Sequence, residues 1–186
     1  MAVDAFIYFT VPNGIDPKLC PKGETQDAFF SKKNAFEIKD FSFGAENPHT
    51  IGSATGGAGA GKIKFNEFEI KKPTDKTSPI FFRDSVTGIH YDTVVIAIRK
   101  SGADTKSSGK PYLEYCFNTV FVTKISWSGP GDEGPEESIT FAYGKLGIRY
   151  VVQNTNGKLT GVPKIQGWDQ LTNKTWTPKP GDFSGN

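Results

Sequence analysis

The stretch from Thr50 to Lys72 constrains the fold more than any other, because a run of small residues changes there into strict alternation. Five glycines lie in the first part of it: Gly52, Gly56, Gly57, Gly59 and Gly61. From Lys62 onward charged and apolar residues alternate at a period of two, which predicts a strand with one face in water. Ordering so many glycines costs conformational entropy. We therefore expect a long loop that either packs against something outside its own subunit or stays disordered, and the rest of the chain favours the first.

The same stretch contains the pattern of a phosphate-binding loop, G-x-x-x-x-G-K from Gly56 to Lys62. Such a loop needs a Ser or Thr after the lysine to reach the metal ion, a buried strand before it and a helix after it. Here Ile63 follows the lysine, Pro48 and His49 precede the glycines, and a strand pattern comes next. We therefore predict that the segment binds no nucleotide.

The composition favours one β-rich domain. The chain has 186 residues and is rich in Phe (15), Gly (21) and Pro (12), which suits strands joined by many turns. Its formal net charge is +2 with dispersed charges, so we expect neither a nucleic-acid surface nor a membrane surface. No apolar run approaches the roughly 20 residues of a membrane span. The N-terminus carries Asp4 and lacks a basic region and a cleavage site, which predicts a first strand rather than a signal peptide.

Two strand patterns change phase midway. Phe36 and Ile38 share one phase, whereas Phe41 and Phe43 share the other, and residues 63–70 repeat this change. Such changes re-aim side chains where a sheet curls. Further strand patterns lie at 3–11, 88–102, 112–127, 139–152 and 166–171. Together they predict a mainly β fold, a small antiparallel β-barrel of two sheets with one short α-helix on its flank.

The helix pattern runs from Thr77 to Val86. Ser78 is a natural N-cap with a proline after it, and Gly88 supplies a C-terminal stop. Phe82 and Val86, at positions i and i+4, are expected to face inward. In the strand 112–127, alternation places Thr119 and Phe121 on the same side as Phe117.

The chain divides into one domain and a tail. We expect the barrel domain to span residues 1–174, with Trp168 anchored in its core, and residues 175–186 to form a flexible tail. No internal repeat is visible at periods of roughly 20–50 residues.

No set of residues supports catalysis. His49 and His90 are the only histidines, and each stands alone in the sequence. Cys20 and Cys116 match no zinc or redox spacing and are expected to be free thiols. No serine lies in a G-x-S-x-G turn, and the acidic residues at 132–137 lie among Gly and Pro, as in a solvated turn. We therefore predict a protein that is not an enzyme and that holds no metal and no cofactor.

Several short motifs occur in a fixed order along nearly the whole chain. They are M-A-V-D-A-F-I at the start, G-E-T-Q-D at 23–27, F-S-F-G at 41–44, the glycine loop ending A-G-K at 60–62, D-K-T-S-P at 75–79, G-x-H-Y and I-R-K-S-G within 88–102, L-E-Y at 113–115, residues 139–150 and G-W-D at 167–169. In this order they resemble the haemolysin-coregulated proteins (Hcp) of bacterial type VI secretion, whose W-S-W-G is F-S-F-G here.

The resemblance implies a tube subunit. Six copies would form a ring, and rings would stack into the inner tube of a contractile injection machine. Sheath contraction would expel this tube, and its lumen would hold and protect small effector proteins. The implied partners are the chain itself, the spike protein, the sheath and the effectors. The implied location is the bacterial cytoplasm before firing and the outside of the cell afterwards. The glycine-rich loop, with Lys62, would reach a neighbouring subunit or the next ring.

Ser42 is the candidate contact to cargo. Alternation sends Phe41 and Phe43 to one side of the strand and Ser42 to the other. The resemblance of F-S-F-G to W-S-W-G favours a position on the lumen, and the alternative is an ordinary surface serine.

Two other functions remain open at this point. One is a monomeric β-sandwich that binds a ligand on exposed aromatic platforms such as Trp127 and Trp176. The other is a tail-tube protein of a related phage-like particle. Mass in solution separates the first of these from a ring.

Overall fold

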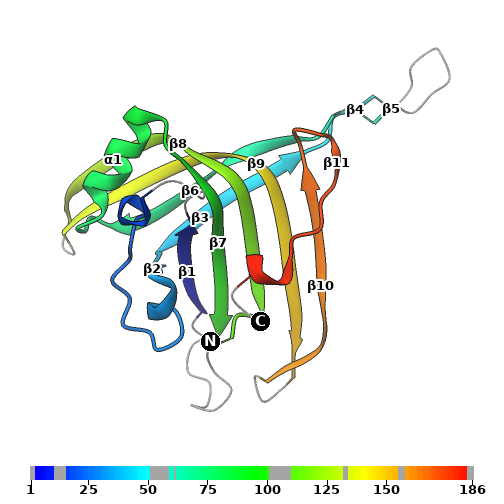
Figure 1. Ribbon diagram of the computed structural model, residues 1–186, viewed down its shortest axis with the longest axis horizontal. Helices are drawn as coiled ribbons and strands as arrows, with labels where there is room; N and C mark the ends of the chain where they lie inside the picture. Colours follow the sequence, from blue (N-terminus) through cyan, green and yellow to red (C-terminus); the bar gives the residue numbers. More distant parts are fainter. Residues whose placement is uncertain are drawn as a thin grey trace.

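The computed structural model describes residues 3–10, 16–50, 59–60, 62–100, 110–131, 134–154 and 158–183. In this part the chain is mainly β with one α-helix (Figure 1). The strands are β1 (Val3–Thr10), β2 (Phe36–Glu37), β3 (Asp40–Glu46), β4 (His49–Thr50), β5 (Gly59–Ala60), β6 (Lys64–Pro73), β7 (His90–Lys100), β8 (Leu113–Gly131), β9 (Gly134–Gln153), β10 (Leu159–Asp169) and β11 (Lys174–Thr175). The helix is α1 (Ser78–Thr87), and three 3-10 turns are η1 (Pro17–Leu19), η2 (Ser31–Lys33) and η3 (Pro180–Asp182).

Nine strands form one antiparallel sheet that curls on itself. Its main path is β11-β10-β9-β8-β7-β1-β2, β6 pairs with β9, and β3 pairs with β6. The corner between β2 and β3 lies against two strands, because the N–H of Ile38 donates to Ala5 O of β1 and the N–H of Lys39 donates to Lys71 O of β6. No continuous ladder closes the sheet in the described residues. The predicted mainly antiparallel β fold is confirmed. The predicted barrel of two sheets is not, because the nine strands form a single curled sheet.

Both predicted phase changes occur where the sheet turns. Phe36 and Ile38 are buried where the chain lies along β1, and Phe41 and Phe43 face the core where it lies along β6. Within the β3–β6 pair the register shifts between Ser42 and Gly44. The extra residue on β6 turns the side chains that follow to the opposite face.

β8 and β9 run through two different halves of this sheet. The second neighbour of β9 is β6 along 136–141 and β10 along 145–153. At the change, Asn118 pairs with Lys145 and Val120 with Tyr143, and Thr119 and Gly144 between them do not pair although the register does not shift. Thr119 has a left-handed backbone with φ 56°. We call the part with β1, β7 and β10 the covered half and the part with β3 and β6 the open half.

This irregularity corrects the prediction for β8. Thr119 and Phe121 were placed on the same side as Phe117, but the alternation of buried residues reverses at Thr119, where the backbone is left-handed. Phe117, Val120 and Val122 belong to the core, whereas Phe121 lies on the other face and is 39% exposed.

The inner core is aromatic and α1 closes one end of it. The ring of Phe68 stacks between those of Phe117 (4.2 Å between centroids) and Phe141 (4.6 Å). Phe81 of α1 is fully buried in the same cluster.

The helix begins and ends near the predicted residues but presents another face. Thr77 is the N-cap in place of the predicted Ser78, which is the first helical residue, whereas Gly88 ends the helix in the left-handed conformation, as predicted. Phe82 and Val86 are 52% and 66% exposed, so the prediction that they face inward was wrong. The helix instead buries Phe81 and Asp84, and Asp84 is held by the hydroxyl of Tyr91, which donates to it at 2.7 Å.

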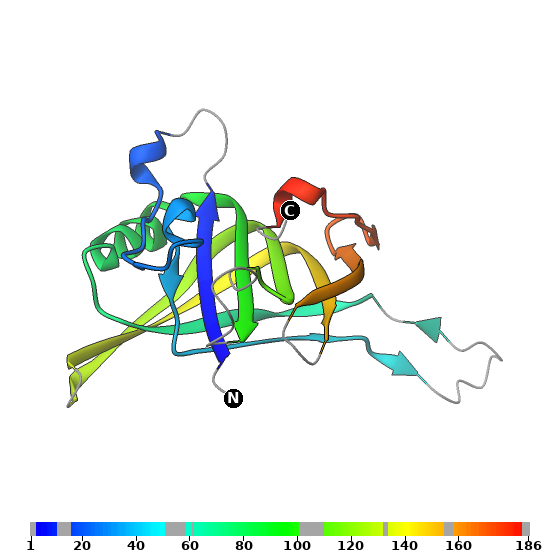
Figure 2. The same ribbon diagram turned by 90° about the horizontal axis from the view of Figure 1, so that it is seen from below.

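The covered half has a second core on its outer face. This outer cluster contains Phe6, Tyr8, Phe30, Ala35, Val95, Ala97, Cys116 and Phe183. Two segments cover it, which we call the N-terminal strap (27–35) and the C-terminal strap (174–183; Figure 2). The rings of Phe6 and Phe30 stack with their centroids 4.2 Å apart.

The C-terminal strap lies close against glycines of the sheet. A Cβ on Gly147 would be 2.3 Å from Pro178 Cγ, and one on Gly167 would be 2.6 Å from the Trp176 carbonyl oxygen. The strap was expected to be a loose tail, but its described part is packed as far as Phe183, which is 2% exposed. Trp168, expected in the core, is half-buried on β10.

Candidate wall and assembly surfaces

The outer face of the open half is polar and forms two aligned rows across four strands. One row of register partners is Ser42, Glu69, Thr140 and Lys124, and the next is Asp40, Lys71, Ser138 and Ser126. All eight are exposed or half-exposed. The residues between them, such as Ile70 and Ile139, are fully buried on the other face. We call this surface the polar wall.

The charges of the polar wall balance. The two rows hold two carboxylates and two amines, and an ion pair within them joins Lys71 Nζ to Asp40 Oδ2 at 3.7 Å. Both of these side chains are more than half exposed, so the pair contributes little to stability. The wall therefore offers hydroxyl groups and screened charges but no concentrated field of one sign.

Ser42 lies on this wall. The rings of Phe41 and Phe43 stack with centroids 6.2 Å apart and contact Tyr115 on the inner side. Ser42 between them points the other way and is exposed, as the alternation predicts. Its role as a contact to cargo is a proposal, taken up below.

β3 and β6 lead into a ribbon that stands off from the body (Figures 1 and 2). In it, His49 pairs with Ala60 and Thr50 with Gly59. Lys62 is exposed at its base. The other candidates for an inter-subunit loop, Gly52, Gly56, Gly57 and Gly61, lie outside the described residues.

A buried charge network supports the open half from its inner side. Lys72 and Glu137 have side chains that are 2% and 0% exposed, and Lys72 Nζ lies 2.7 Å from Glu137 Oε1 and 3.1 Å from Asp75 Oδ2. Glu137 Oε2 accepts from the indole N–H of Trp127 at 3.1 Å. Sequence reasoning missed this network, although Lys72 shares the phase of the buried Phe68 and Ile70 on β6.

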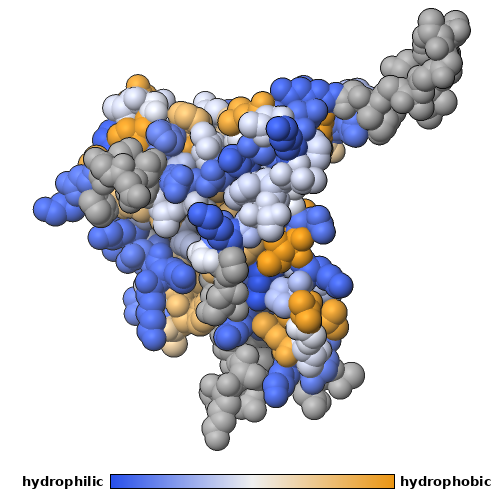
Figure 3. Space-filling model, turned by 45° about the vertical axis from the view of Figure 1, so that its right-hand side comes forward, coloured by the Kyte–Doolittle hydropathy of each residue, from blue (hydrophilic) through white to orange (hydrophobic). Residues whose placement is uncertain are grey.

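The two tryptophans proposed as ligand platforms differ. Trp127 is 52% exposed, but its indole nitrogen is tied to the buried Glu137. Trp176 belongs to the C-terminal strap, is half-buried and packs on the outer cluster. On the side with β10 and β11, apolar patches lie scattered among polar ones (Figure 3). Val162 and Leu171 are exposed apolar residues of this region, at 83% and 64%.

Cys20 and Cys116 are not joined by a disulfide. Burial raises the pKa of Cys116 well above its ordinary value. Throughout the described ranges, no group of three or more His, Cys, Asp or Glu residues is placed to hold a metal ion. In the same ranges no helix has the length and apolar character needed to cross a bilayer.

A protruding ribbon and a polar wall are therefore the distinctive surfaces of the described chain. Residues 8–150 match the model of the family described as type VI secretion system effector, Hcp. The chain belongs to this Hcp family, as the motif order predicts.

Solved structures agree with this assignment. One described as a type six secretion system protein is 29% identical, covers 94% of this chain and 100% of its own, and has a TM-score of 0.78. Hcp1 from Salmonella typhimurium is 23% identical over 95% of this chain and 100% of its own, with a TM-score of 0.70. A type VI secretion system effector from Yersinia pestis is 23% identical over 89% and 99%, with a TM-score of 0.59. The last two show the fold. No curated protein matches the chain.

Proposed function

We propose that this type VI secretion tube protein assembles into hexameric rings, which stack into a tube that is ejected with effector proteins in its lumen. In this proposal the partners are further copies of the chain, the spike protein, the sheath and the effectors. The protein is in the cytoplasm before firing and outside the cell afterwards. No catalytic step is part of the proposal.

The polar wall is the observation that carries the cargo role. An antiparallel sheet with one face on the core can leave its other face in water. Here that face is a surface of hydroxyls and balanced charges spanning four strands. Such a surface can hold a folded protein through many weak hydrogen bonds, and it can release that protein without breaking any strong one.

The ribbon supports the stacking role. A two-stranded ribbon on its own is marginally stable in water, and β4 and β5 pair with each other in a sheet separate from the main one. A contact with the next ring or a neighbouring subunit would supply the missing packing. The glycines of the loop and Lys62 are the candidates for this contact.

Ser42→Gln tests the cargo role. We expect purified rings of unchanged mass in light scattering, because no core atom moves. We expect severalfold less effector to be recovered with them in a pull-down after co-expression, because six longer side chains would crowd one layer of the channel. Ser31→Gln is the matched control, since Ser31 is an exposed serine on η2, away from the wall.

Two outcomes would contradict separate parts of the proposal. Equal recovery of effector with Ser42→Gln and wild-type rings would place Ser42 outside the lumen. A wild-type mass near that of one 20.3 kDa chain at micromolar concentration would contradict the ring itself.

A further inference from the structure

An exposed aromatic ring lies beside the polar wall. Phe121 of β8 is 39% exposed on the outer face, where the two rows of the wall hold only polar and charged residues. Its register partner on β9 is Ala142, two residues along from Thr140 of the wall. Two residues span about 7 Å of strand and point to the same face. The ring therefore borders the row that contains Ser42.

The backbone places this ring outside at a cost. The alternation of buried residues reverses at Thr119, which has a left-handed φ of 56°. A positive φ is unfavourable for a β-branched residue, and such strain clusters at functional sites. The bend of the sheet accounts for an irregular backbone here, but it does not require an aromatic side chain at Phe121. A serine or threonine at that position would continue the polar wall.

A second ring and a second apolar side chain extend this surface. The ring of His90, the register partner of Phe121 on β7, lies 5.3 Å from the Phe121 ring between centroids. On the other side come Ala142 and then Gly144, where a Cβ would lie 3.0 Å from Leu171 Cδ1. Leu171 itself is 64% exposed. We call His90, Phe121, Ala142, Gly144 and Leu171 the apolar strip.

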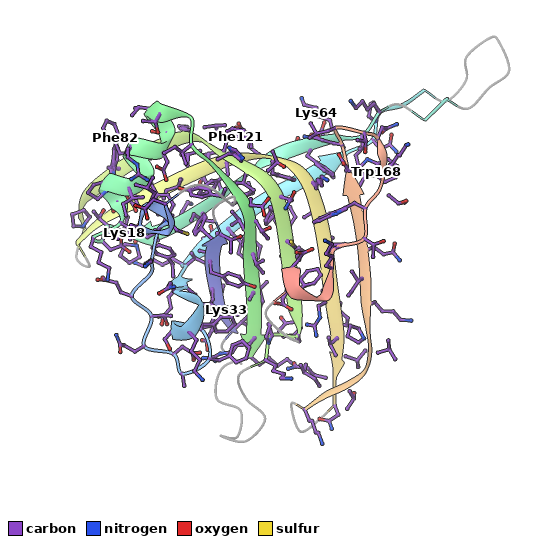
Figure 4. All side chains as sticks on the ribbon, viewed as in Figure 1. Lys18, Lys33, Lys64, Phe82, Phe121 and Trp168 are labelled. Carbon is purple, nitrogen blue, oxygen red and sulfur yellow. The ribbon has the colours of Figure 1, made fainter. Side chains whose placement is uncertain are left out.

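The apolar strip lies where the two halves of the sheet meet. Phe121 is found beside the start of β7, where β8 turns towards the open half (Figure 4). Phe121 and Leu171 are exposed, so neither strap covers them in the described residues. Single exposed apolar residues are ordinary, whereas contiguous groups mark interaction sites. The strip is therefore a candidate contact that is continuous with the polar wall.

The chemistry of the strip selects an apolar group. The wall row beside it holds one carboxylate, Glu69, and one amine, Lys124, so this row favours neither sign of charge. On the other side, the amine of Lys145 is already paired with Asp169 at 3.3 Å. An aliphatic or aromatic side chain laid on Phe121 would remove apolar surface of both partners from water.

We propose that the apolar strip anchors cargo by taking an exposed aliphatic or aromatic side chain of a folded effector protein. The polar wall makes the surrounding hydrogen bonds. This inference rests on the proposed cargo role and names the chemistry that selects the cargo. Continuity with the wall is the reason for assigning the strip to cargo rather than to another partner. Aromatic anchors supply much of the binding energy at protein interfaces, so one such group can fix the position of an otherwise weakly held protein.

Phe121→Ser tests the anchor. We expect rings of unchanged mass in light scattering and about tenfold less recovery of the effector co-expressed in the Ser42 experiment. Phe121→Leu keeps an apolar side chain and should recover effector within about threefold of wild type. Leu171→Ser should lower recovery severalfold. Because Leu171 is more exposed than Phe121, this variant decides the question if Phe121→Ser chains do not form rings.

Val162→Ser is the control, because Val162 is an exposed apolar residue of β10 outside the strip. We expect it to recover effector like wild type. Undiminished recovery with both Phe121→Ser and Leu171→Ser would overturn the anchor, and a loss with Ser42→Gln in the same experiment would show that the cargo role stands without it. Wild-type rings that recover no effector would contradict the cargo role and the anchor together.

Sodium sulfate separates an apolar anchor from a charged one. Sulfate strengthens apolar burial and screens charges. We expect the recovery of effector by wild-type rings to rise in sodium sulfate, and the recovery by Phe121→Ser rings to stay level or fall. A fall for both would show that charges dominate the contact and would overturn the inference.

Discussion

The two halves of the sheet share β8 and β9 yet differ in what lies on their outer faces. In the covered half, Val95 and Cys116 are fully buried beneath the two straps. In the open half, the residues of the polar wall are exposed or half-exposed. The same strands thus have two apolar faces in one place and one apolar face in the other.

This difference means that the covered half contributes more to stability, whereas the open half provides a surface that can vary. Burial on both faces of the covered half removes apolar area from water twice, at about 25 cal/mol per Å². The open half gains that stabilisation on its inner face only, so its outer residues can change without disturbing the core. Changes of similar size should therefore have unequal effects in the two halves.

The largest difference is expected between Phe183 and Thr140. Phe183→Ala removes a 2% exposed ring from the outer cluster, and we expect it to lower the free energy of unfolding by about 3 kcal/mol. Thr140→Ala on the polar wall should change it by less than about 0.5 kcal/mol. Chemical denaturation measures both. Losses of equal size would contradict the division into a covered and an open half.

A smaller effect is expected from a single added carbon under the C-terminal strap. Gly147→Ala should cost about 1–2 kcal/mol, because the new Cβ would lie 2.3 Å from Pro178 Cγ and would displace the strap. Gly181→Ala is the control within the same strap, since a Cβ there meets no atom within 4 Å. If both variants unfold alike, the strap does not lie on Gly147 in solution.

The smallest effect concerns the N-terminal strap and pH. Burial raises the pKa of Asp27, but hydrogen bonds from the N–H groups of Phe30 and Phe29 and from Arg99 outweigh burial and hold it below its ordinary value. A carboxyl with a lowered pKa in the folded state stabilises the fold above the unfolded pKa of 3.8. This contribution is lost as the pH falls through the folded pKa.

We therefore expect the stability advantage of the wild type over Asp27→Asn to shrink as the pH is lowered from about 5 to below 4. The variant should be less stable at neutral pH and should show a flatter acid profile in thermal unfolding. Parallel profiles would show that Asp27 does not hold the strap.

The corners of the sheet could be predicted from the sequence, because they change the phase of alternating apolar residues. Phe36, Ile38, Phe41 and Phe43 show such a change directly, and the structure places a corner between the two pairs. The position of Ser42 opposite its neighbours follows from the same rule. The closure of the sheet does not follow, since it depends on which strands pair at a distance.

For other elements the sequence pattern does not show which face is buried or where the segment packs. α1 contains Phe81 and Phe82 side by side, and the face that is buried depends on Asp84, a polar residue that pattern analysis assigns to solvent. The left-handed backbone at Thr119 leaves no mark on the alternation of apolar residues in the sequence, so Phe121 was placed on the wrong face. The C-terminal strap has no periodicity, because it lies on the sheet as an extended segment rather than pairing along its length.

The shared hairpin also determines how a subunit responds to force. β8 and β9 stay paired from Leu113–Tyr150 to Gly131–Gly134, with two register shifts on the way, and interstrand hydrogen bonds lie across the strands. A push along the hairpin loads these bonds together, whereas a pull on one edge opens them one after another. The molecule is therefore stiff along β8 and β9 and weak across them. A subunit whose hairpin lay along the direction of thrust would transmit a sudden displacement with little internal deformation.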